Sequence, residues 1–272
     1  MTAILVVVAL AAVAGLGWML FESQWVEFIE RDVTIPGLPR ELDGLTVLHL
    51  SDFHLGTLSL NGRTLRKAVD WAEKAPVDLV AITGDLVSRR RGERTLLAAL
   101  ERLRSRHGTY AILGNHDVAA TRDPFSSPAD LTGLDEQGAR LLEHEAVMFE
   151  AAGRTVQVAG ADPRRRRKGL RELAAPETDL RILLVHFPDD VRSLAAGDFH
   201  LILAGHLHGG QICIPTPGGK VHLEHLRAPY WEGLFELPVG VLHVSRGLGT
   251  SFVPFRLLAR PEATRLTLKA AE

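Results

Sequence analysis

The chain has 272 residues, of which 46% are hydrophobic and 24% charged, a balance typical of a globular protein rather than a disordered one. Its net charge is −2 with both signs mixed along the chain, so charge gives no indication of a nucleic-acid partner, and we expect none. The single cysteine, Cys213, excludes an intramolecular disulfide and a cysteine-rich zinc site.

Residues 3–21 carry no charge and are long enough, at about 1.5 Å per residue, to cross a hydrocarbon core of roughly 30 Å. Trp18 and Trp25 lie where aromatic side chains at a membrane interface are expected. We therefore expect residues 1–25 to form a single-pass anchor in the cell (inner) membrane. The alternatives are a buried helix and a signal peptide cleaved near Ala12-Val13-Ala14, although such a peptide would begin with a positively charged segment.

The rest of the chain, residues 26–272, is expected to form one domain. Arg31 and Arg40 follow the apolar segment and favour a cytoplasmic location for this domain. Residues 26–35 alternate and stop at a Pro-Gly turn, which is typical of an edge strand.

Periodicity predicts the elements that follow. Strands are expected at 45–50, 77–82, 109–113, 181–185, 200–204, 241–244 and 264–268, a hairpin at 147–159, and helices at 61–74 (with Asn61 as a capping residue), 95–106 and 138–142. In the first half, a strand, a polar motif and a helix recur in that order, which indicates a largely parallel sheet with active residues at the carboxyl ends of its strands. Residues 123–133 are turn-rich and could form a substrate-side loop.

Five of these strands end in polar motifs that contain potential metal ligands. The motifs are Ser51-Asp52-Phe53-His54, Gly84-Asp85, Gly114-Asn115-His116-Asp117, Val185-His186 and Gly205-His206-Leu207-His208. Singly, such residues more often serve in turns or as caps. As an ordered set they supply enough oxygen and nitrogen ligands for two divalent ions, and their mixture suits Mn, Fe, Zn or Co better than Mg or Ca.

In order and spacing, this set of motifs resembles that of the calcineurin-like metallophosphoesterases. The resemblance implies an α/β fold with four layers, in which two mixed β-sheets pack together and helices lie outside. It also implies a two-metal hydrolase of phosphoester bonds, with the ions, Mn foremost, activating the attacking water.

Carried over by motif, the family's ligand roles fall on seven residues. Asp52, His54 and His208 would bind one ion, Asn115, His186 and His206 the second, and Asp85 both. His116 would stabilise the phosphoryl oxygens or protonate the leaving group, and Asp117 would orient His116.

Three further stretches resemble a membrane-associated bacterial branch of the family: 209–212, 245–250 and 260–262. That branch includes phosphodiesterases and enzymes similar to UDP-2,3-diacylglucosamine pyrophosphatase, a hydrolase of lipid A biosynthesis. The expected substrate is therefore a phosphorylated small molecule or a lipid-linked one. A phosphodiesterase of broad specificity and a non-catalytic metal-binding membrane protein are the alternatives.

One run of positive charge stands out, Arg164, Arg165, Arg166 and Arg167 followed by Lys168. It follows the end of a predicted strand. A solvated loop, a contact with substrate phosphates and a contact with acidic lipid headgroups are all compatible with this run.

Overall fold

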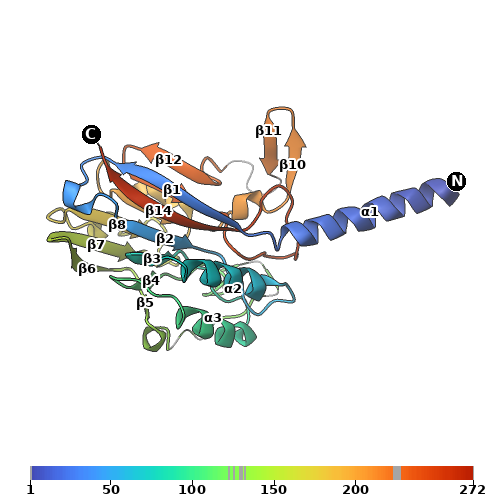
Figure 1. Ribbon diagram of the computed structural model, residues 1–272, viewed down its shortest axis with the longest axis horizontal. Coiled ribbons are helices and arrows are strands. Elements are labelled where there is room, and N and C mark those ends of the chain that lie inside the picture. Colours follow the sequence, from blue (N-terminus) through green and yellow to red (C-terminus); the bar gives the residue numbers. More distant parts are fainter. Residues whose placement is uncertain are drawn as a thin grey trace.

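Two six-stranded β-sheets pack face to face, and one long helix extends away from them (Figure 1). The computed structural model describes residues 2–121, 123, 124, 126–128, 131, 133–222 and 228–271. The turn-rich segment 123–133 is therefore described only in part, with residues 125, 129, 130 and 132 outside the described set.

The first sheet has the strand order β1-β14-β2-β3-β4-β5. Its strands are β1 (Glu27–Ile35), β14 (Glu262–Ala270), β2 (Thr46–Leu50), β3 (Leu79–Ile82), β4 (Thr109–Ala111) and β5 (Ala139–Leu141). Strands β2 to β5 run parallel, whereas β14 is antiparallel to β2 and parallel to β1. The carboxyl ends of β2, β3 and β4 therefore meet at one edge, where three of the five motifs begin.

The second sheet has the order β12-β13-β9-β8-β7-β6. Its strands are β12 (Gly233–Leu237), β13 (Gly240–Val244), β9 (Leu201–Ala204), β8 (Leu180–Leu184), β7 (Arg154–Gly160) and β6 (Glu145–Ala151). The four central strands are parallel, and the two edge strands are antiparallel to their neighbours. The remaining two motifs follow β8 and β9.

The main core lies between the two sheets. Buried side chains from both sheets meet there: Val47, Leu79 and Ile112 from the side of the first sheet, and Ile182 and Leu203 from the second. Because strand residues alternate between faces, the neighbours of these residues point outward to a second layer on each side. Each sheet is consequently covered on both faces, which explains its nearly continuous apolar strands.

The outer layers differ between the two sheets. Helices α2 (Asn61–Ala72) and α3 (Glu93–Leu100) cover the first sheet through Leu65, Val69 and Leu96. The second sheet is covered by short 3₁₀ segments, η4 (Arg171–Leu173) and η5 (Pro188–Ser193), and by adjoining loops. The predicted fold class, two mixed sheets with outer layers, is confirmed.

Some local predictions were wrong. Residues 139–141 form the edge strand β5 instead of a helix, because they pair with β4. Helix α3 begins at Glu93 and ends at Leu100, short of the predicted end at residue 106. Asn61 is no cap: its amide donates to the carbonyl oxygens of His54 and Thr250. The hairpin of β10 (Cys213–Thr216) and β11 (Gly219–His222) was not predicted.

The apolar N-terminal segment forms helix α1 (Thr2–Glu22), which projects from the body (Figure 1). No part of its apolar stretch is buried, which contradicts the buried-helix alternative. Its length and composition suffice to cross a membrane, and a signal sequence would share both features. One N-terminal apolar helix therefore suggests a membrane anchor.

Candidate metal centre

The backbone of the motifs is held in a sparsely populated conformation. Five residues that the sequence nominates as ligands have positive φ angles, between 45° and 77°: Asp52, His54, Asp85, His206 and His208. A residue with a side chain in this region costs of order 1 kcal/mol or more, and such residues cluster at functional sites. The strand ends thus store strain where the candidate ligands lie.

Glycines allow the motif loops to approach one another. A Cβ atom on Gly114 would lie 2.1 Å from Oδ1 of Asp85, and one on Gly205 would lie 2.3 Å from Oδ2 of Asp52. Any side chain at these two positions would therefore displace a candidate ligand. The glycines are part of the site because they let backbone from different strands come close to the carboxylates.

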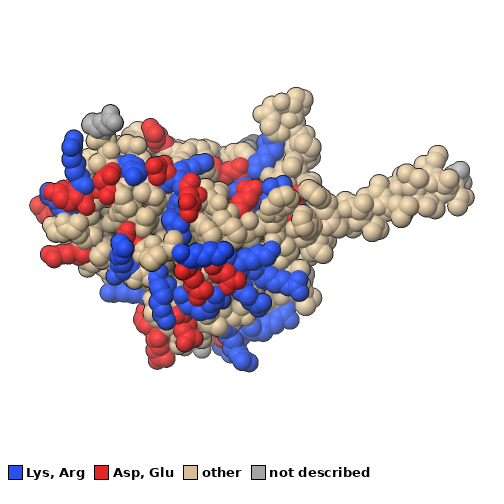
Figure 2. Space-filling view, in the orientation of Figure 1, with Lys and Arg blue, Asp and Glu red and all other residues tan. Residues whose placement is uncertain are grey.

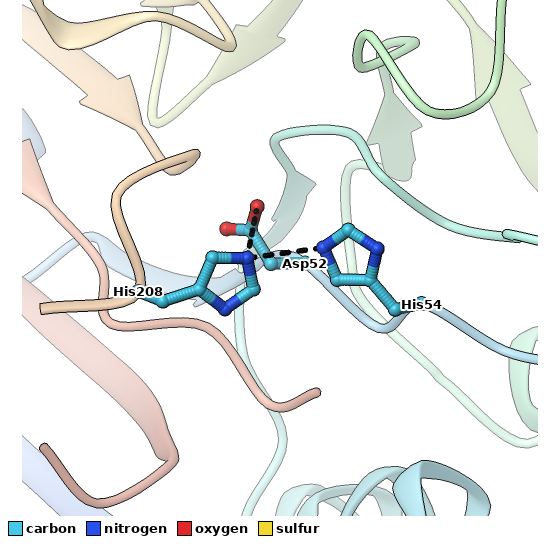
Figure 3. A group of neighbouring side chains, drawn as sticks. All are labelled: Asp52, His54 and His208. Atoms are coloured by element: carbon cyan, nitrogen blue, oxygen red, sulfur yellow. Dashed lines mark hydrogen bonds and ion pairs between the residues drawn. The ribbon is translucent and has the colours of Figure 1, made fainter. Parts of the chain in front are cut away.

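Three side chains form a first cluster: Asp52 and His54 after β2, and His208 after β9 (Figure 3). The Nε2 atoms of His54 and His208 lie 3.0 Å apart, and Nε2 of His208 lies 3.7 Å from Oδ1 of Asp52. All three are buried.

A second cluster joins Asp85, His186 and His206. Oδ2 of Asp85 lies 3.3 Å from Nε2 of His186, and the same nitrogen lies 3.0 Å from Oδ1 of Asn115. Oδ2 of Asp85 also lies 3.4 Å from Nε2 of His54, in the first cluster. The Asp85 carboxylate therefore faces both clusters.

These separations fit divalent ions. Two donor atoms that each bind one ion at about 2.1 Å lie about 3.0 to 3.4 Å apart, depending on the angle between the bonds. Four donor pairs fall at 3.0 to 3.4 Å: His54 with His208, His186 with Asn115, and Asp85 with each of His54 and His186. The pair of His208 and Asp52 is slightly wider, at 3.7 Å. The mixture of imidazole, carboxylate and amide donors is one that transition metals accept. The His/Asp clusters can hold divalent metal ions, whose identity the donors leave open.

Burial and charge shape the electrostatics of the centre. Burial raises the pKa of Asp52 to about 6 and lowers the pKa of His54 to about 3. Burial alone would also lower the pKa of His186, but the Asp85 carboxylate raises it to about 9. Burial thus disfavours charge on both Asp52 and His54, whereas the Asp85 carboxylate attracts positive charge to the position of His186.

Neighbouring groups hold the histidine rings in place. Nδ1 of His186 lies 2.8 Å from the carbonyl oxygen of Thr83, which can only accept, so Nδ1 carries a proton and Nε2 is the ring atom that faces Asp85 and Asn115. Nδ1 of His54 lies 3.1 Å from Oγ of Ser88. Oγ of Ser51 donates to Oδ2 of Asp52 at 2.5 Å. Such outer contacts orient metal ligands, and neither Thr83 nor Ser88 was predicted.

His116 lies beside the metal centre, but its ring contacts Ser126 and Asp123 and not the expected partner, Asp117. Its Nε2 atom is 4.0 Å from Oδ2 of Asp85, and its Nδ1 atom is 2.6 Å from Oγ of Ser126 and 3.5 Å from Oδ2 of Asp123. The turn-rich segment therefore supplies the groups that orient this ring. Asp123 and Ser126 were missed because nothing in their local sequence distinguishes them from ordinary turn residues.

The role predicted for Asp117 is wrong. Its carboxylate accepts hydrogen bonds from the backbone N–H groups of Leu86, Val87 and Gly114, at 2.8 to 3.2 Å. It thus fastens the loop after β3 to the loop after β4. Burial and the nearby Asp85 charge raise the pKa of Asp117 to about 7.

Arg256 is a fully buried cation that the sequence did not single out. Its guanidinium donates to the carbonyl oxygens of His208, Gly249 and Ala259, and it lies 3.2 Å from Nδ1 of His208. Burial lowers the pKa of Arg256 to about 9, so it stays charged at neutral pH. Arg256 connects the loop after β13 to a candidate metal ligand.

The arginine run 164–167 is largely neutralised by acidic side chains. Arg164 pairs with Asp162 and Glu143, and both Arg166 and Arg167 pair with Asp189. Of the four arginines, Arg166 also lies 3.5 Å above the ring of Phe187, whose centroid is 4.5 Å from that of His206. Arg166 is therefore the member of the run that the described contacts place beside the metal centre.

The sequence profile of the calcineurin-like phosphoesterases matches residues 45–210. The chain belongs to this family. The matched segment contains all seven candidate ligands and His116. Membership in the family and the His/Asp clusters together identify the protein as a metal-dependent phosphoesterase. The predicted family and enzyme class are confirmed.

Curated relatives agree with this assignment. The chain is 32% identical over 234 residues to the uncharacterized metallophosphoesterase YkoQ of Bacillus subtilis, covering 84% of each chain. It is 27% identical over 277 residues to the uncharacterized metallophosphoesterase YkuE of the same organism, covering 96% of this chain and 92% of that one. It is also 32% identical over 263 residues to a transmembrane protein with metallophosphoesterase domain from Bos taurus, covering 88% of this chain and 56% of that protein.

Proposed function

We propose that this phosphoesterase is a two-metal hydrolase, anchored to the membrane, that cleaves phosphoester or pyrophosphate bonds in lipid-linked substrates. The observation that carries the two-metal part is the position of Asp85, whose Oδ2 atom faces His54 on one side and His186 on the other. Asp52, His54 and His208 would hold one ion, Asn115, His186 and His206 would hold the other, and Asp85 lies where it could serve both.

Bound ions would supply Lewis acidity and lower the pKa of water, with Mn the first candidate and Fe, Zn or Co the alternatives. The chain itself supplies the remaining functions. His116 presents Nε2 toward the cluster, where it can stabilise a phosphoryl oxygen or give a proton to the departing oxygen. Ser126 and Asp123 hold the other nitrogen of that ring. Arg166 is the candidate for a contact with a second phosphate.

Aromatic and basic side chains support the membrane location. At the end of α1, the ring of Phe21 contacts those of Trp18 and Trp25, with centroids 5.7 and 5.6 Å apart, and Arg260 covers Trp25 at 3.8 Å. Such a group of aromatic rings is typical of a membrane interface. The site would then lie close to substrates that reside in the bilayer.

A basic face adjoins this end of α1. We define it by six exposed residues of α2, η2 (Arg90–Gly92) and α3: Arg63, Arg66, Lys67, Arg90, Arg91 and Arg94. In Figure 2, Lys and Arg side chains gather over α2 and α3, on the part of the body nearest to α1. Nζ of Lys67 donates to the carbonyl oxygen of Gln24, just after α1. Anionic headgroups of a cytoplasmic leaflet would attract such a face, which supports a cytoplasmic domain.

The substrate candidate is UDP-2,3-diacylglucosamine, which combines a pyrophosphate with acyl chains and would place the enzyme in lipid A biosynthesis. Purified full-length protein loaded with Mn should release UMP from this substrate. In a separate experiment on cell membranes, the protein should sediment with the membranes after carbonate washing. Hydrolysis of bis-p-nitrophenyl phosphate without UMP release would reject the lipid A role and favour a phosphodiesterase of broad specificity. A soluble mature protein that begins after residue 14 would reject the anchor.

A further inference from the structure

An apolar cleft of about 310 Å³ lies beside the metal centre and has no part in the ligand set. Leu58, Phe252, Val253 and Pro254 form its apolar wall, and Arg89 and Arg91 form its charged rim. Three chain segments build it: the loop between β2 and α2, the segment between β3 and α3, and the loop that follows β13.

One end of the cleft adjoins catalytic groups. The ring of Phe252 packs edge-on against His116, with centroids 6.4 Å apart. Oγ1 of Thr57, another lining residue, donates to the carbonyl oxygen of His54 at 3.3 Å. A phosphate held at the two clusters would therefore direct one of its substituents toward the cleft.

One of the loops that line the cleft also contacts the base of α1. The backbone N–H of Arg256, two residues after the cleft residue Pro254, donates to the carbonyl oxygen of Met19 in α1 at 3.2 Å. The same loop therefore contacts His116, through Phe252, and the helix that is proposed to cross the bilayer, through Arg256.

The apolar wall is unusually open to solvent. The side chains of Leu58, Phe252 and Val253 are 93%, 49% and 41% exposed. Contiguous exposed apolar side chains at the mouth of a cleft are typical of a binding surface, because their exposure costs free energy that a ligand can recover.

We propose that this cleft binds the alkyl or acyl chain of an amphipathic phosphoester, with Arg89 and Arg91 near its charged head group. The inference rests on the proposed function, because the phosphate of the same molecule must lie at the metal centre. The two arginines suit this role, since Nη2 of Arg89 and Nε of Arg91 contact backbone carbonyls and so hold both guanidinium groups at the rim. The exposed apolar mouth lets a chain enter from the bilayer while the phosphate reaches the ions.

A pair of inhibitors tests the proposal by kinetics. Octyl phosphate and methyl phosphate carry the same phosphate and differ only in the alkyl chain. Both compounds are tested as inhibitors of bis-p-nitrophenyl phosphate hydrolysis by Mn-loaded full-length protein in phosphatidylcholine nanodiscs. The Ki of octyl phosphate should be at least about tenfold lower than that of methyl phosphate, because a few methylene groups of its chain leave water on binding. The double variant Phe252→Ser, Val253→Ser should lose most of this ratio. Met148→Ser, an exposed apolar residue on β6, should keep it.

A fluorescent label gives a readout that does not depend on turnover. The only native cysteine, Cys213, is buried, so an environment-sensitive dye on Leu58→Cys should report from the mouth of the cleft. Octyl phosphate should shift its emission to the blue, methyl phosphate should not, and the same dye on Met148→Cys should respond to neither. If hydrolysis is intact but the two Ki values are equal and the dye shows no shift, the proposed role of the cleft is overturned and the proposed function stands. If no phosphoester is hydrolysed, the proposed function fails. In that case the dye response by itself supports or overturns the binding of an alkyl chain in the cleft.

Discussion

His116 bridges two parts of the molecule, since one ring nitrogen faces Asp85 and the other contacts Ser126 and Asp123. We predict that His116→Ala lowers kcat by about 10² to 10⁴. Asp123→Asn should lower kcat by a smaller factor with little change in KM, because it disturbs only the orientation of the ring. Both losses should be larger for an alkoxide leaving group than for p-nitrophenolate.

Asp117 is expected to affect stability, in contrast to Asp123, which is expected to affect kcat. Because its carboxylate accepts three backbone hydrogen bonds, Asp117→Asn should lower the free energy of unfolding by about 1 to 3 kcal/mol. Urea titration of the full-length protein in detergent measures this change. A selective loss of kcat in Asp117→Asn at unchanged stability would restore the orienting role to Asp117.

The ligands were predictable at this scale because each motif is local: an apolar run followed by polar residues, with a glycine before them in three of the five motifs. Thr83, Ser88 and Ser126 were not predictable, because their contacts join segments that only the fold brings together. Asp117 was misassigned for the same reason. It is adjacent to His116 in sequence, but its side chain turns toward the backbone of the neighbouring loop.

At the scale of elements, the loop after β13 is held by one side chain. Arg256→Leu would remove the donor shared by carbonyl oxygens of His208, Gly249 and Ala259. We predict a loss of about 3 to 5 kcal/mol in the free energy of unfolding, because buried acceptors would be left unpaired. Arg256→Lys should recover part of it, since lysine keeps the charge but lacks the planar fork. Equal urea midpoints for wild type and Arg256→Leu would contradict this account.

Strands and helices differed in how well the sequence predicted them. Long apolar runs such as 181–185 and 200–204 predicted β8 and β9 because buried parallel strands are apolar on both faces. The three-residue strand β5 was mistaken for a helix, since its pairing with β4 depends on tertiary contact and not on local periodicity. Strand β12 and the β10–β11 hairpin lack a sustained apolar pattern.

At the scale of the whole molecule, a buried histidine pair joins the two sheets. His49 lies on β2 and His243 on β13, and their Nδ1 atoms are 2.7 Å apart. Burial lowers the pKa of both rings, that of His243 from 6.5 to about 4. Between about pH 6.5 and 4 the unfolded chain therefore binds more protons than the folded one. Stability is fully present above this window and falls as the pH falls through it.

The expected loss from His243 alone is about 3 kcal/mol across that window, of which about 2 kcal/mol is lost by pH 5. Urea unfolding of metal-free full-length protein at pH 7.5 and pH 5 measures it. His243→Asn, which keeps a polar group near the position of Nδ1, should lose less stability than the wild type over the same interval. An equal loss in both proteins would show that His243 does not carry this dependence.

One long apolar helix and a basic face lie near one another (Figures 1 and 2), and Arg91 belongs both to this basic face and to the rim of the apolar cleft. The sequence predicted the helix, because an uncharged run is visible without a fold. It did not predict the basic face or the cleft, since both are assembled from loops and helices far apart in the chain. The proposals on location and substrate therefore rest on the structure more than on the motifs.

The central proposal is that Asp85 and the candidate ligands on either side of it would hold two ions for phosphoester hydrolysis. Its most direct test is the hydrolysis of bis-p-nitrophenyl phosphate by metal-stripped full-length protein, with and without added Mn, alongside metal analysis. We predict that Mn restores hydrolysis with two ions bound per chain. Asp85→Asn should abolish activity and reduce the ion count, whereas Glu150→Gln, an exposed change on β6, should do neither. Unchanged hydrolysis in Asp85→Asn, or none with Mn, Fe, Zn or Co, would contradict the claim.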